Sequence, residues 1–138
     1  MNRILRDGRL VTTAAVCRRG NLFFLARRKP GGSESLRWEF PGGKCDADVR
    51  EQVCLVREFE EEFGVTIEVQ EELGSVPFEH GGTAYILVGY RAHMPEDARL
   101  ELREHVDSGW FAPDVITRMD LSGSDRVLLE QILAAASE

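Results

Sequence analysis

The feature that most constrains the fold is a helical pattern enclosed between two glycine-containing breaks. Apolar residues recur at steps of four and three, and they are Val49, Val53, Val56, Phe59 and Phe63. This period is that of an α-helix, so we expect a helix over about 49–63 with one buried face. The turn Pro41-Gly42-Gly43 precedes the pattern, and Gly64 follows it where a helix would end. We therefore expect the fold to be built around this helix.

The same helix carries a dense group of glutamates. Glu58 lies three residues before Glu61 and four before Glu62, so these three side chains are expected on one face. Arg57 is four residues before Glu61 and can neutralise part of the cluster, whereas Glu60 is expected in solvent. Carboxylates so close together repel one another, and a divalent cation with hard oxygen ligands would relieve that repulsion. A solvated acidic face is the alternative.

Strand patterns lie on both sides of the helix. Segments rich in Val, Thr, Ala and aromatic residues predict strands over about 9–17, 22–26, 38–40, 65–69, 76–78 and 84–90. Residues 27–36 include a proline and two glycines and predict a mobile loop. A short helix is expected from about Pro113 and a last helix over about 124–136. This order predicts a mixed α/β sandwich, and 138 residues fit a single domain spanning 1–138.

The charge balance narrows the class of partner. The formal net charge of −7 argues against a nucleic acid polymer, which needs a basic stripe to replace phosphate counterions. With 43% hydrophobic and 30% charged residues, the composition is that of a soluble globular protein. There is no apolar run long enough for a membrane span, and Met1-Asn2-Arg3 lacks the apolar segment of a signal peptide. We therefore expect a cytoplasmic protein with no membrane partner.

The cysteines and histidines suggest no covalent framework and no zinc site. Cys17, Cys45 and Cys54 form no Cys-x-x-Cys pair, and an odd number does not make a disulfide framework. We expect each to be a small buried or half-buried residue in a reducing cytoplasm rather than a nucleophile. The histidines are scattered without the spacing of zinc ligands, at His80, His93 and His105.

The stretch from Gly43 to Val65 resembles the Nudix box, written G-x5-E-x7-R-E-U-x-E-E-x-G-U, where U is a bulky apolar residue. Here Gly43 is followed after five residues by Val49, and after seven more by Arg57-Glu58-Phe59-Glu60-Glu61-Glu62-Phe63-Gly64-Val65. Every fixed position matches except that Val49 replaces the first glutamate. A pattern with so many fixed positions rarely arises by chance. The resemblance implies the Nudix α/β/α sandwich with a mixed β-sheet.

The resemblance continues outside the box. Trp38-Glu39-Phe40-Pro41-Gly42-Gly43-Lys44 is similar to the approach to the box in MutT-like nucleoside triphosphate pyrophosphohydrolases, including a branch that favours cytidine nucleotides. Arg27-Arg28 stands where those proteins carry a basic pair at a strand end. Glu104 resembles a loop glutamate proposed to bind metal or act as a base. Leu121-Ser122-Gly123-Ser124-Asp125 resembles the segment that opens the last helix and carries a base-reading Asn or Asp.

What the family implies is hydrolysis of a nucleoside diphosphate linked to a further group. Mg²⁺ or Mn²⁺ would bridge the phosphates, while a carboxylate orients or deprotonates the attacking water. Matched to the box, the metal ligands would be Gly43, Glu58, Glu61 and Glu62. Arg57 would orient Glu58 through a charge-assisted hydrogen bond. The catalytic residues would be Arg57, Glu58, Glu61 and Glu104. The resemblance leaves open whether Glu58 or Glu104 is the general base.

Five residues are expected to contact the substrate: Arg27, Arg28, Phe40, Lys44 and Asp125. The three basic side chains would meet phosphates, although the two arginines can equally be solvated strand-end charges. Phe40 would stack on a base or else belong to the core. The carboxylate of Asp125 would accept a hydrogen bond from an exocyclic amino group, which cytosine offers and uracil does not. Its alternative is to cap the last helix.

Val49 is the one departure from the box. A valine cannot ligate metal or accept a hydrogen bond, and three outcomes stay open. Asp48 or Glu51 takes the place of the missing glutamate, the site works with weaker metal binding, or the chain binds nucleotides without hydrolysing them. The intact Arg57-Glu58 and Glu61-Glu62 favour an active site.

The expected function is metal-dependent hydrolysis of a nucleoside triphosphate to nucleoside monophosphate and pyrophosphate. The substrate would be of the modified purine or the cytidine type, and Asp125 favours the second. The alternatives are a hydrolase of ADP-ribose or nucleotide sugars, and a non-catalytic nucleotide-binding module. The expected partner is this small-molecule nucleotide, and assembly into a homodimer is left open.

Overall fold

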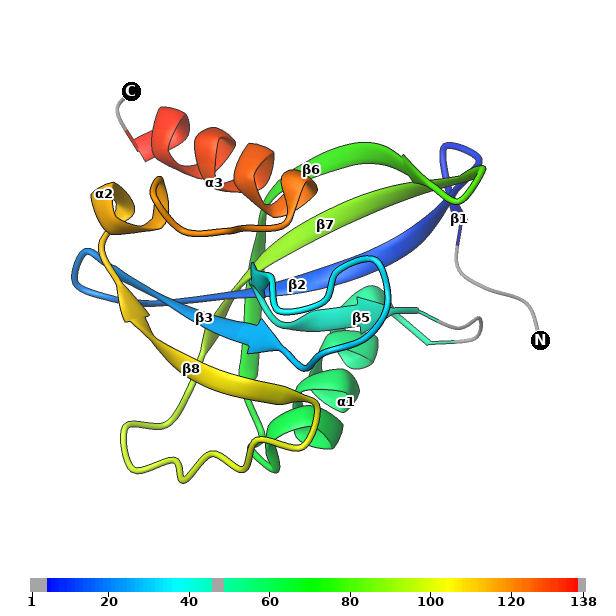
Figure 1. Cartoon of the computed structure of the whole chain (residues 1–138). Coiled ribbons are helices and arrows are strands. Elements are labelled where there is room, and N and C mark those ends of the chain that lie inside the picture. The colour runs from blue at the N-terminus through cyan, green and yellow to red at the C-terminus, as the bar shows by residue number, and fades with distance from the viewer. Residues whose placement is uncertain (1–4, 46–48, 137–138) are drawn as a thin grey trace.

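The computed structural model describes residues 5–45 and 49–136, drawn in colour in Figure 1. The described elements, in chain order, are β1 (Leu5–Arg6), β2 (Arg9–Arg19), β3 (Leu22–Arg28), β4 (Trp38–Glu39), β5 (Gly42–Lys44), α1 (Glu51–Phe63), β6 (Glu68–His80), β7 (Thr83–His93), β8 (His105–Phe111), α2 (Pro113–Ile116) and α3 (Gly123–Ala136).

A mixed sheet built on β2 forms the middle of the molecule. β2 runs parallel to β7, and antiparallel to β3 and to the short strand β5, where Thr13 lies opposite Gly43. β6 extends the sheet beyond β7, while β4 and β8 both pair with β3. Figure 1 shows α1 and α3 on opposite sides of this sheet. The expected α/β/α sandwich with a mixed sheet is confirmed.

Each face of the sheet has its own apolar core. Along β2, Ala15 and Cys17 belong to the core that contains α1, while Ala14 and Val16 belong to the core that contains α3. Successive side chains of a strand point to opposite faces, so one strand supplies both cores. Because β2 is buried on both faces, it is a rigid base for β5, the short strand that carries the box glycine.

The central helix was predicted correctly in extent but not in its whole buried face. α1 ends at Gly64, whose φ of 70° is left-handed and whose N–H donates to the carbonyl of Glu60 at 2.8 Å. Val53, however, is 47% exposed. It lies two residues from Leu55, or about 200° around the helix, and so faces solvent. The buried residues are Cys54, Leu55, Phe59, Glu62 and Phe63.

Two strand predictions were wrong in extent. The separate strands expected over 65–69 and 76–78 are replaced by the single long strand β6, whose pairing with β7 shifts register on either side of Glu72. Pro77 does not break β6, because an edge strand tolerates proline. Gly74 also lies within β6. A Cβ atom there would come within 2.6 Å of the Gln131 side chain, so glycine allows α3 to lie close to the strand. β8 was not predicted, because its sequence lacks a clear alternation of apolar and polar residues.

The prediction that the cysteines form no disulfide was wrong. Cys45 and Cys54 are joined by a disulfide, with their Cα atoms 5.7 Å apart. Sequence spacing failed here because α1 folds back onto β5 and brings two cysteines nine positions apart together. The expected burial of all three cysteines is confirmed, and Cys17 is a free thiol. None of the helices in the described part of the chain has the length and apolarity to cross a membrane.

Candidate active site

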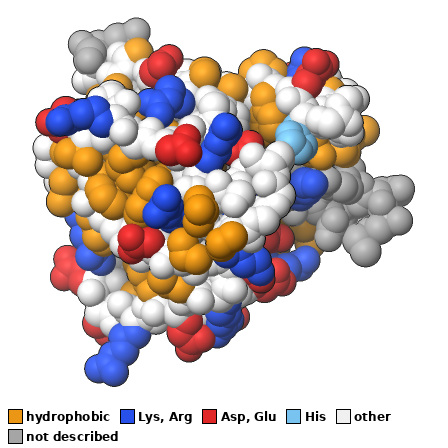
Figure 2. Space-filling model, viewed as in Figure 1, with side chains coloured by type: hydrophobic (Ala, Val, Ile, Leu, Met, Phe, Trp, Pro, Cys, Tyr) orange, Lys and Arg blue, Asp and Glu red, His pale blue; other side chains and the backbone are white. Residues whose placement is uncertain are grey.

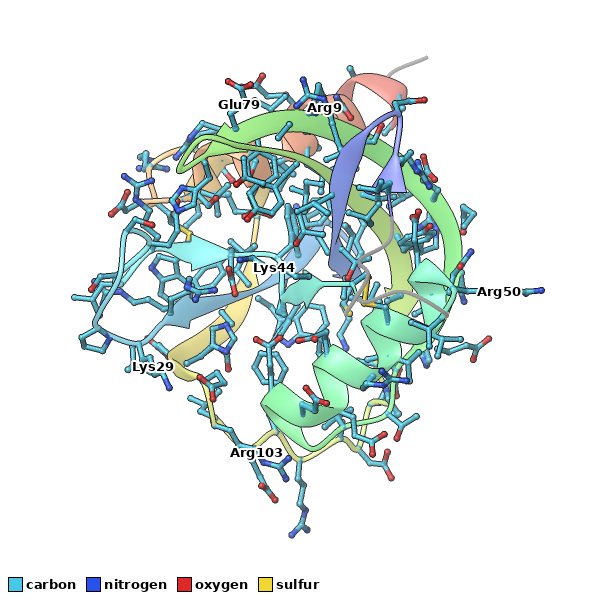
Figure 3. The ribbon with its side chains drawn as sticks, turned by 90° about the vertical axis from the view of Figure 1, so that its right-hand side faces the viewer. Arg9, Lys29, Lys44, Arg50, Glu79 and Arg103 are labelled. Carbon is cyan, nitrogen blue, oxygen red and sulfur yellow. A yellow bond between two sulfur atoms is a disulfide. The ribbon has the colours of Figure 1, made fainter. Side chains whose placement is uncertain are left out.

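A cavity of about 550 Å³ opens where β5, the end of the β6–β7 hairpin, the loop 29–37 and the start of α3 meet. Lys44 lines it and lies near the middle of Figure 3, with Lys29 to one side and α1 to the other. Of the residues predicted to form a site, those that line the cavity are Arg28, Phe40, Gly43, Lys44 and Asp125. The structure thus joins residues from four separate segments in one cavity.

A cluster beside this cavity, here called the acidic end, is formed by Glu39, Glu58, Glu62 and His105, of which Glu39 lines the cavity. The Nε2 atom of His105 lies 2.9 Å from a carboxylate oxygen of Glu39 and 4.0 Å from one of Glu62. Donor atoms of these three residues lie within 4.8 Å of one another, close enough to hold a metal ion. The ring of His105 stacks on Phe63 of α1 at 5.0 Å, which fixes its position.

Glu62 is the most perturbed carboxyl of the acidic end. Burial raises its pKa to about 9, and the charges of Glu39 and Glu58 act in the same direction. Its Oε1 atom is buried and has no hydrogen-bond partner among the described residues. A divalent cation would offset both the burial of the charge and the repulsion between the carboxylates. The residues present therefore fit the metal that the box implies.

Gly43 brings the backbone of β5 against the helix. A Cβ atom at this position would lie 2.5 Å from the Oε2 atom of Glu58, so the close approach depends on glycine. The hydroxyl of Thr13 donates to the carbonyl of Gly43 at 3.2 Å. Thr13 is only 2% exposed, so this contact fixes β5 on the central strand. The box glycine and the box glutamate are thus held face to face.

The end of α1 is tied to the segment that carries Glu104. The guanidinium of Arg103 donates to the carbonyls of Glu60 and Glu61 at 3.2 and 3.3 Å, where Figure 3 shows it at the end of the helix. Donors there stabilise the last carbonyls of a helix. Glu104 itself is about half exposed and forms an ion pair with Lys29 at 2.7 Å, which lowers its pKa. The predicted loop glutamate therefore lies at the rim of the acidic end.

The other charged residues of the box face solvent. Arg57, Glu60 and Glu61 are exposed, and Glu60 accepts a hydrogen bond from Thr66 at 3.2 Å. The expected exposure of Glu60 is confirmed. Glu61 was expected to share a face with Glu62, but Glu62 is buried where Glu61 is not. Adjacent residues of an α-helix point about 100° apart, so Glu62 can face the core while Glu61 faces solvent.

Another part of the cavity wall, here called the apolar end, is formed by Phe40, Phe78, Leu87 and Asp125. Phe78 is half-buried and stacks on Tyr85 at 5.3 Å, so one ring face of this pair borders the cavity wall. Phe40 is only 3% exposed and packs edge-to-face on Phe23. Phe40 therefore serves the core as well as the cavity, and Phe78 has the larger surface for stacking.

Asp125 is a buried carboxyl within the first turn of α3. Burial raises its pKa well above the usual value, and hydrogen bonds from Ser122 and the Phe40 backbone offset only part of that shift. Its Oδ1 atom has no hydrogen-bond partner in the described part of the chain. α3 starts at Gly123, and Arg126 donates to the carbonyl of Ser122 at 3.0 Å. Asp125 is therefore inside the helix and not its cap.

The two residues of the predicted basic pair, Arg27 and Arg28, differ in whether they line the cavity. Arg28 lines the cavity and lies 3.3 Å from the second carboxylate oxygen of Glu39. Arg27 instead donates to the carbonyl of Leu36 at 2.9 Å and does not line the cavity. Lys44 lies 5.5 Å above the Tyr85 ring and is exposed, so it is available to an incoming phosphate. On the face drawn in Figure 2, basic side chains lie among acidic ones and form no stripe.

Glu51 does not replace the glutamate missing at Val49. Its carboxylate accepts hydrogen bonds from Tyr90 at 2.7 Å and from Arg6 at 2.9 Å, and these partners hold it at the start of α1. Val49 packs against the core that contains both disulfide cysteines. Asp48, the other candidate replacement, lies outside the described residues.

Sequence reasoning missed Glu39 and His105. Glu39 stood inside the quoted segment before the box, and that position was the available signal for it. His105 follows Glu104 directly, but its partners are distant in the chain and β8 was not predicted. Only the pairing of β8 and β4 with β3 brings the two side chains together.

The comparisons with known proteins agree with this geometry. The NUDIX domain family matches residues 8–132. The chain belongs to the Nudix family. This Nudix chain is 32% identical over 122 residues to CTP pyrophosphohydrolase from Escherichia coli (strain K12), which covers 88% of this chain and 89% of that protein. Membership and this relative make the chain a hydrolase that acts on phosphoric anhydride bonds.

Two further proteins resemble this chain, one in sequence and one in fold. The 8-oxo-dGTP diphosphatase of Proteus vulgaris is 32% identical over 57 residues, or 41% of this chain and 51% of that protein. The crystal structure of MutT protein from Methanosarcina mazei Go1 matches with a TM-score of 0.83 and covers 98% of this chain and 100% of that one. At 24% identity it shows the fold alone.

Proposed function

We propose that this Nudix hydrolase acts as one domain over residues 1–138 and converts a cytidine-type nucleoside triphosphate into the monophosphate and pyrophosphate, with Mg²⁺ or Mn²⁺. One observation carries the proposal. One cavity is lined by Glu39 and Gly43, which border an acidic end that fits a divalent cation, and by a buried carboxyl, Asp125, that is suited to reading a base. A triphosphate bound in the cavity would place its phosphates beside the acidic end and its base beside Asp125.

The metal would be held by the Gly43 backbone carbonyl and by Glu58, Glu61 and Glu62. Glu58 and Glu62 lie at the acidic end, whereas Glu61 would approach from the solvent side. When bound, the metal ions neutralise phosphate oxygens and lower the electrostatic barrier to attack.

The chain's own residues would bind the phosphates and activate the water. Arg28 and Lys44 border the cavity and supply positive charge to the phosphate oxygens. Arg57 would orient Glu58. The attacking water would give its proton to the carboxylate of Glu58 or of Glu104 as its oxygen bonds to phosphorus and pyrophosphate leaves. The exposed carboxylate of Glu104 has a lowered pKa, so it is ionised and able to accept a proton at neutral pH.

Base selection would come from the apolar end. A cytosine ring would lie against Phe78, with Phe40 behind it, and its amino group would donate to the unpartnered Oδ1 of Asp125. Uracil has a carbonyl at that position and would leave the buried oxygen unpaired, which is costly. The relative named CTP pyrophosphohydrolase supports this choice. An oxidised purine triphosphate is the second candidate, supported by the relative named 8-oxo-dGTP diphosphatase.

A nucleotide panel tests the proposal. Pyrophosphate release is measured for the common and oxidised nucleoside triphosphates, ADP-ribose and nucleotide sugars, with Mg²⁺, Mn²⁺ or EDTA. We expect metal-dependent turnover of CTP that is lost in Glu62→Gln and kept in the matched control Glu60→Gln, whose side chain is exposed. Faster turnover of ADP-ribose or a nucleotide sugar than of CTP would show that the substrate belongs to that class instead. Tight binding without turnover in any metal would make the chain a non-catalytic module.

The proposal also covers where the enzyme acts and whether two chains assemble. We place the enzyme in the cytoplasm as a nucleotide hydrolase, and a homodimer stays a prediction that light scattering tests. A mass in solution equal to one chain at all concentrations would contradict the homodimer.

A further inference from the structure

The disulfide and the altered box position lie on the same short segment. Cys45 and Cys54 bracket Val49, the position where the box lacks its glutamate. Cys45 follows the strand that carries Gly43, and Cys54 lies in the second turn of α1. The covalent link therefore joins the two backbone segments that carry Gly43 and Glu58, which are β5 and α1.

The link is placed to control the contact between Gly43 and Glu58. Cys45 is two residues beyond Gly43, and Cys54 is one helical turn before Glu58, on the same side of α1. Gly43 and Glu58 are in close contact, as the missing space for a Cβ atom shows. Both cysteines belong to the apolar core against which Val49 packs. A disulfide and apolar packing are thus present in the region where the box would carry a charged glutamate.

We propose that the Cys45–Cys54 disulfide is a redox-controlled clamp that holds Gly43 against Glu58 and so sets the affinity of the site for a divalent cation. The clamp presupposes the metal-dependent function proposed above, because its effect is expressed through the ligands of that metal. It makes this site responsive to the thiol–disulfide balance of its surroundings.

The redox step is ordinary thiol–disulfide exchange. Cys54 is the more exposed of the two, at 4% against 0% for Cys45, so local opening gives a thiolate of a dithiol access to its sulfur. The attack breaks the bond to Cys45, which leaves as a thiolate, and a mixed disulfide forms on Cys54. The second thiolate of the dithiol then displaces the remaining cysteine. Two electrons pass to the protein sulfurs, two protons complete the Cys45 and Cys54 thiols, and the dithiol leaves as a cyclic disulfide.

Reduction would give Cys54 a thiol hydrogen, and the position of its sulfur shows which group could accept it. The Sγ atom of Cys54 lies 3.7 Å from the carbonyl oxygen of Lys44, so the thiol is placed to donate a weak hydrogen bond there. The backbone N–H of Cys45 donates to Val11 of β2 at 3.1 Å, and this bond does not depend on the disulfide. Reduction is therefore expected to loosen the junction of β5 and α1 while β5 stays on the sheet.

The test is a redox titration of metal binding in the absence of nucleotide. The full chain is equilibrated with mixtures of reduced and oxidised dithiothreitol, its free thiols are counted after denaturation, and Mn²⁺ affinity is measured by calorimetry. We expect Mn²⁺ binding about tenfold weaker in the fully reduced chain, at the low end of the effects seen when groups that support metal ligands are lost. The change should follow the fraction of reduced Cys45–Cys54, with circular dichroism showing a folded chain throughout.

Two variants sharpen the test. In Cys17→Ala the redox response should be unchanged, because this buried thiol is not part of the disulfide. In Cys45→Ala/Cys54→Ala the response should vanish, with Mn²⁺ affinity fixed at the reduced value. If the double variant does not fold, the comparison of oxidised and reduced wild-type protein still decides the outcome.

Each result bears on the clamp separately from the catalytic function. Equal Mn²⁺ affinity in the oxidised and reduced chain overturns the clamp, even if CTP is hydrolysed. Three reactive thiols in the oxidised chain also overturn it. Redox-dependent Mn²⁺ affinity without turnover of any nucleotide supports the clamp and removes the proposed function.

Discussion

The acidic end, beside the cavity, and the apolar end, in its wall, bury carboxyl groups in different ways. At the acidic end, Glu62 is surrounded by further carboxylates, and the neighbouring charges of Glu39 and Glu58 add to the effect of burial on its pKa. At the apolar end, burial and the charge of Glu39 raise the pKa of Asp125, but Ser122 and the Phe40 backbone hydrogen-bond to its carboxyl at the start of α3. The first arrangement needs an external cation, whereas the second already satisfies much of its carboxyl and leaves one oxygen for a ligand. Burial alone therefore does not tell a metal ligand from a base reader, but the neighbouring groups do.

The largest effect is expected from Glu62→Gln. It removes a charged ligand from the acidic end, and we expect kcat/KM for CTP to fall by at least about 100-fold, as when other groups that stabilise transition-state charge are lost. The measurement is steady-state pyrophosphate release at saturating Mg²⁺. Less than a threefold loss would show that the acidic end is not the catalytic metal site.

The same variant tests the pKa of Glu62 without any substrate. The pKa is raised from an ordinary value of 4.5 to about 9 in the folded chain, so the folded state binds more protons than the unfolded one between these values. Stability of the metal-free chain should therefore fall as pH rises from about 4.5 to about 9. Thermal unfolding in EDTA should show this fall, and Glu62→Gln should make it smaller.

In the same experiment, Mg²⁺ distinguishes the contribution of the acidic end to the pH dependence of stability from that of the apolar end. It should restore stability at pH 8 in the wild-type chain, because it pairs with the carboxylates of the acidic end. The share of the pH dependence that belongs to Asp125 should persist with Mg²⁺ and in Glu62→Gln. Equal rescue of both chains by Mg²⁺ would contradict the assignment of the metal to the acidic end.

A smaller effect is expected from Asp125→Ala. Loss of one buried acceptor should reduce the preference for CTP over UTP by about tenfold, the size of one good polar contact to a base edge. The rate on the best substrate should change less than the preference does. The measurement is kcat/KM for both nucleotides, with Ser124→Ala at the cavity wall as a control. An unchanged preference would remove Asp125 from base reading.

Glu39→Gln tests whether the two ends are coupled. The charge of Glu39 raises the pKa of both Glu62 and Asp125, so it acts on both the acidic end and the apolar end. Glutamine keeps an acceptor for His105 and removes the charge, and metal-free stability at pH 8 should rise. We expect weaker Mn²⁺ binding, by several-fold. A variant with unchanged metal-free stability and unchanged Mn²⁺ affinity would show that the ends are independent.

The smallest effect is expected from Val53→Ala. Its side chain is 47% exposed on the outer face of α1. Surface changes of this kind usually alter stability by no more than about 0.5 kcal/mol. Chemical denaturation should show a change within that range, while Leu55→Ala, at a fully buried position on the same helix, should cost about 2–5 kcal/mol. Equal costs would contradict the buried face that the structure assigns to α1.

The sequence anticipated the helices well, but it anticipated several strands and the contacts between elements poorly. Gly64 and the phenylalanines of α1 are read from neighbouring residues, so their roles were predicted correctly. Val53 was wrongly predicted to be buried. Its apolar side chain fits the helical period, but only the packing of α1 shows which side of the helix faces the core. The partnership of Cys45 with Cys54 was missed for a similar reason, since it depends on the angle at which α1 returns to β5.

The sequence by itself determined the family, the central helix and the carboxylates that a metal would need. These follow from residue types at fixed spacing, and a helix converts spacing directly into shared faces. Tertiary structure alone decided that Glu39 and His105 join Glu62, that Asp125 shares a cavity with Lys44, and that a disulfide spans Val49. Those groups come from strands and loops far apart in the chain, and only the pairing of strands and the packing of helices on the sheet brings them within reach of one another.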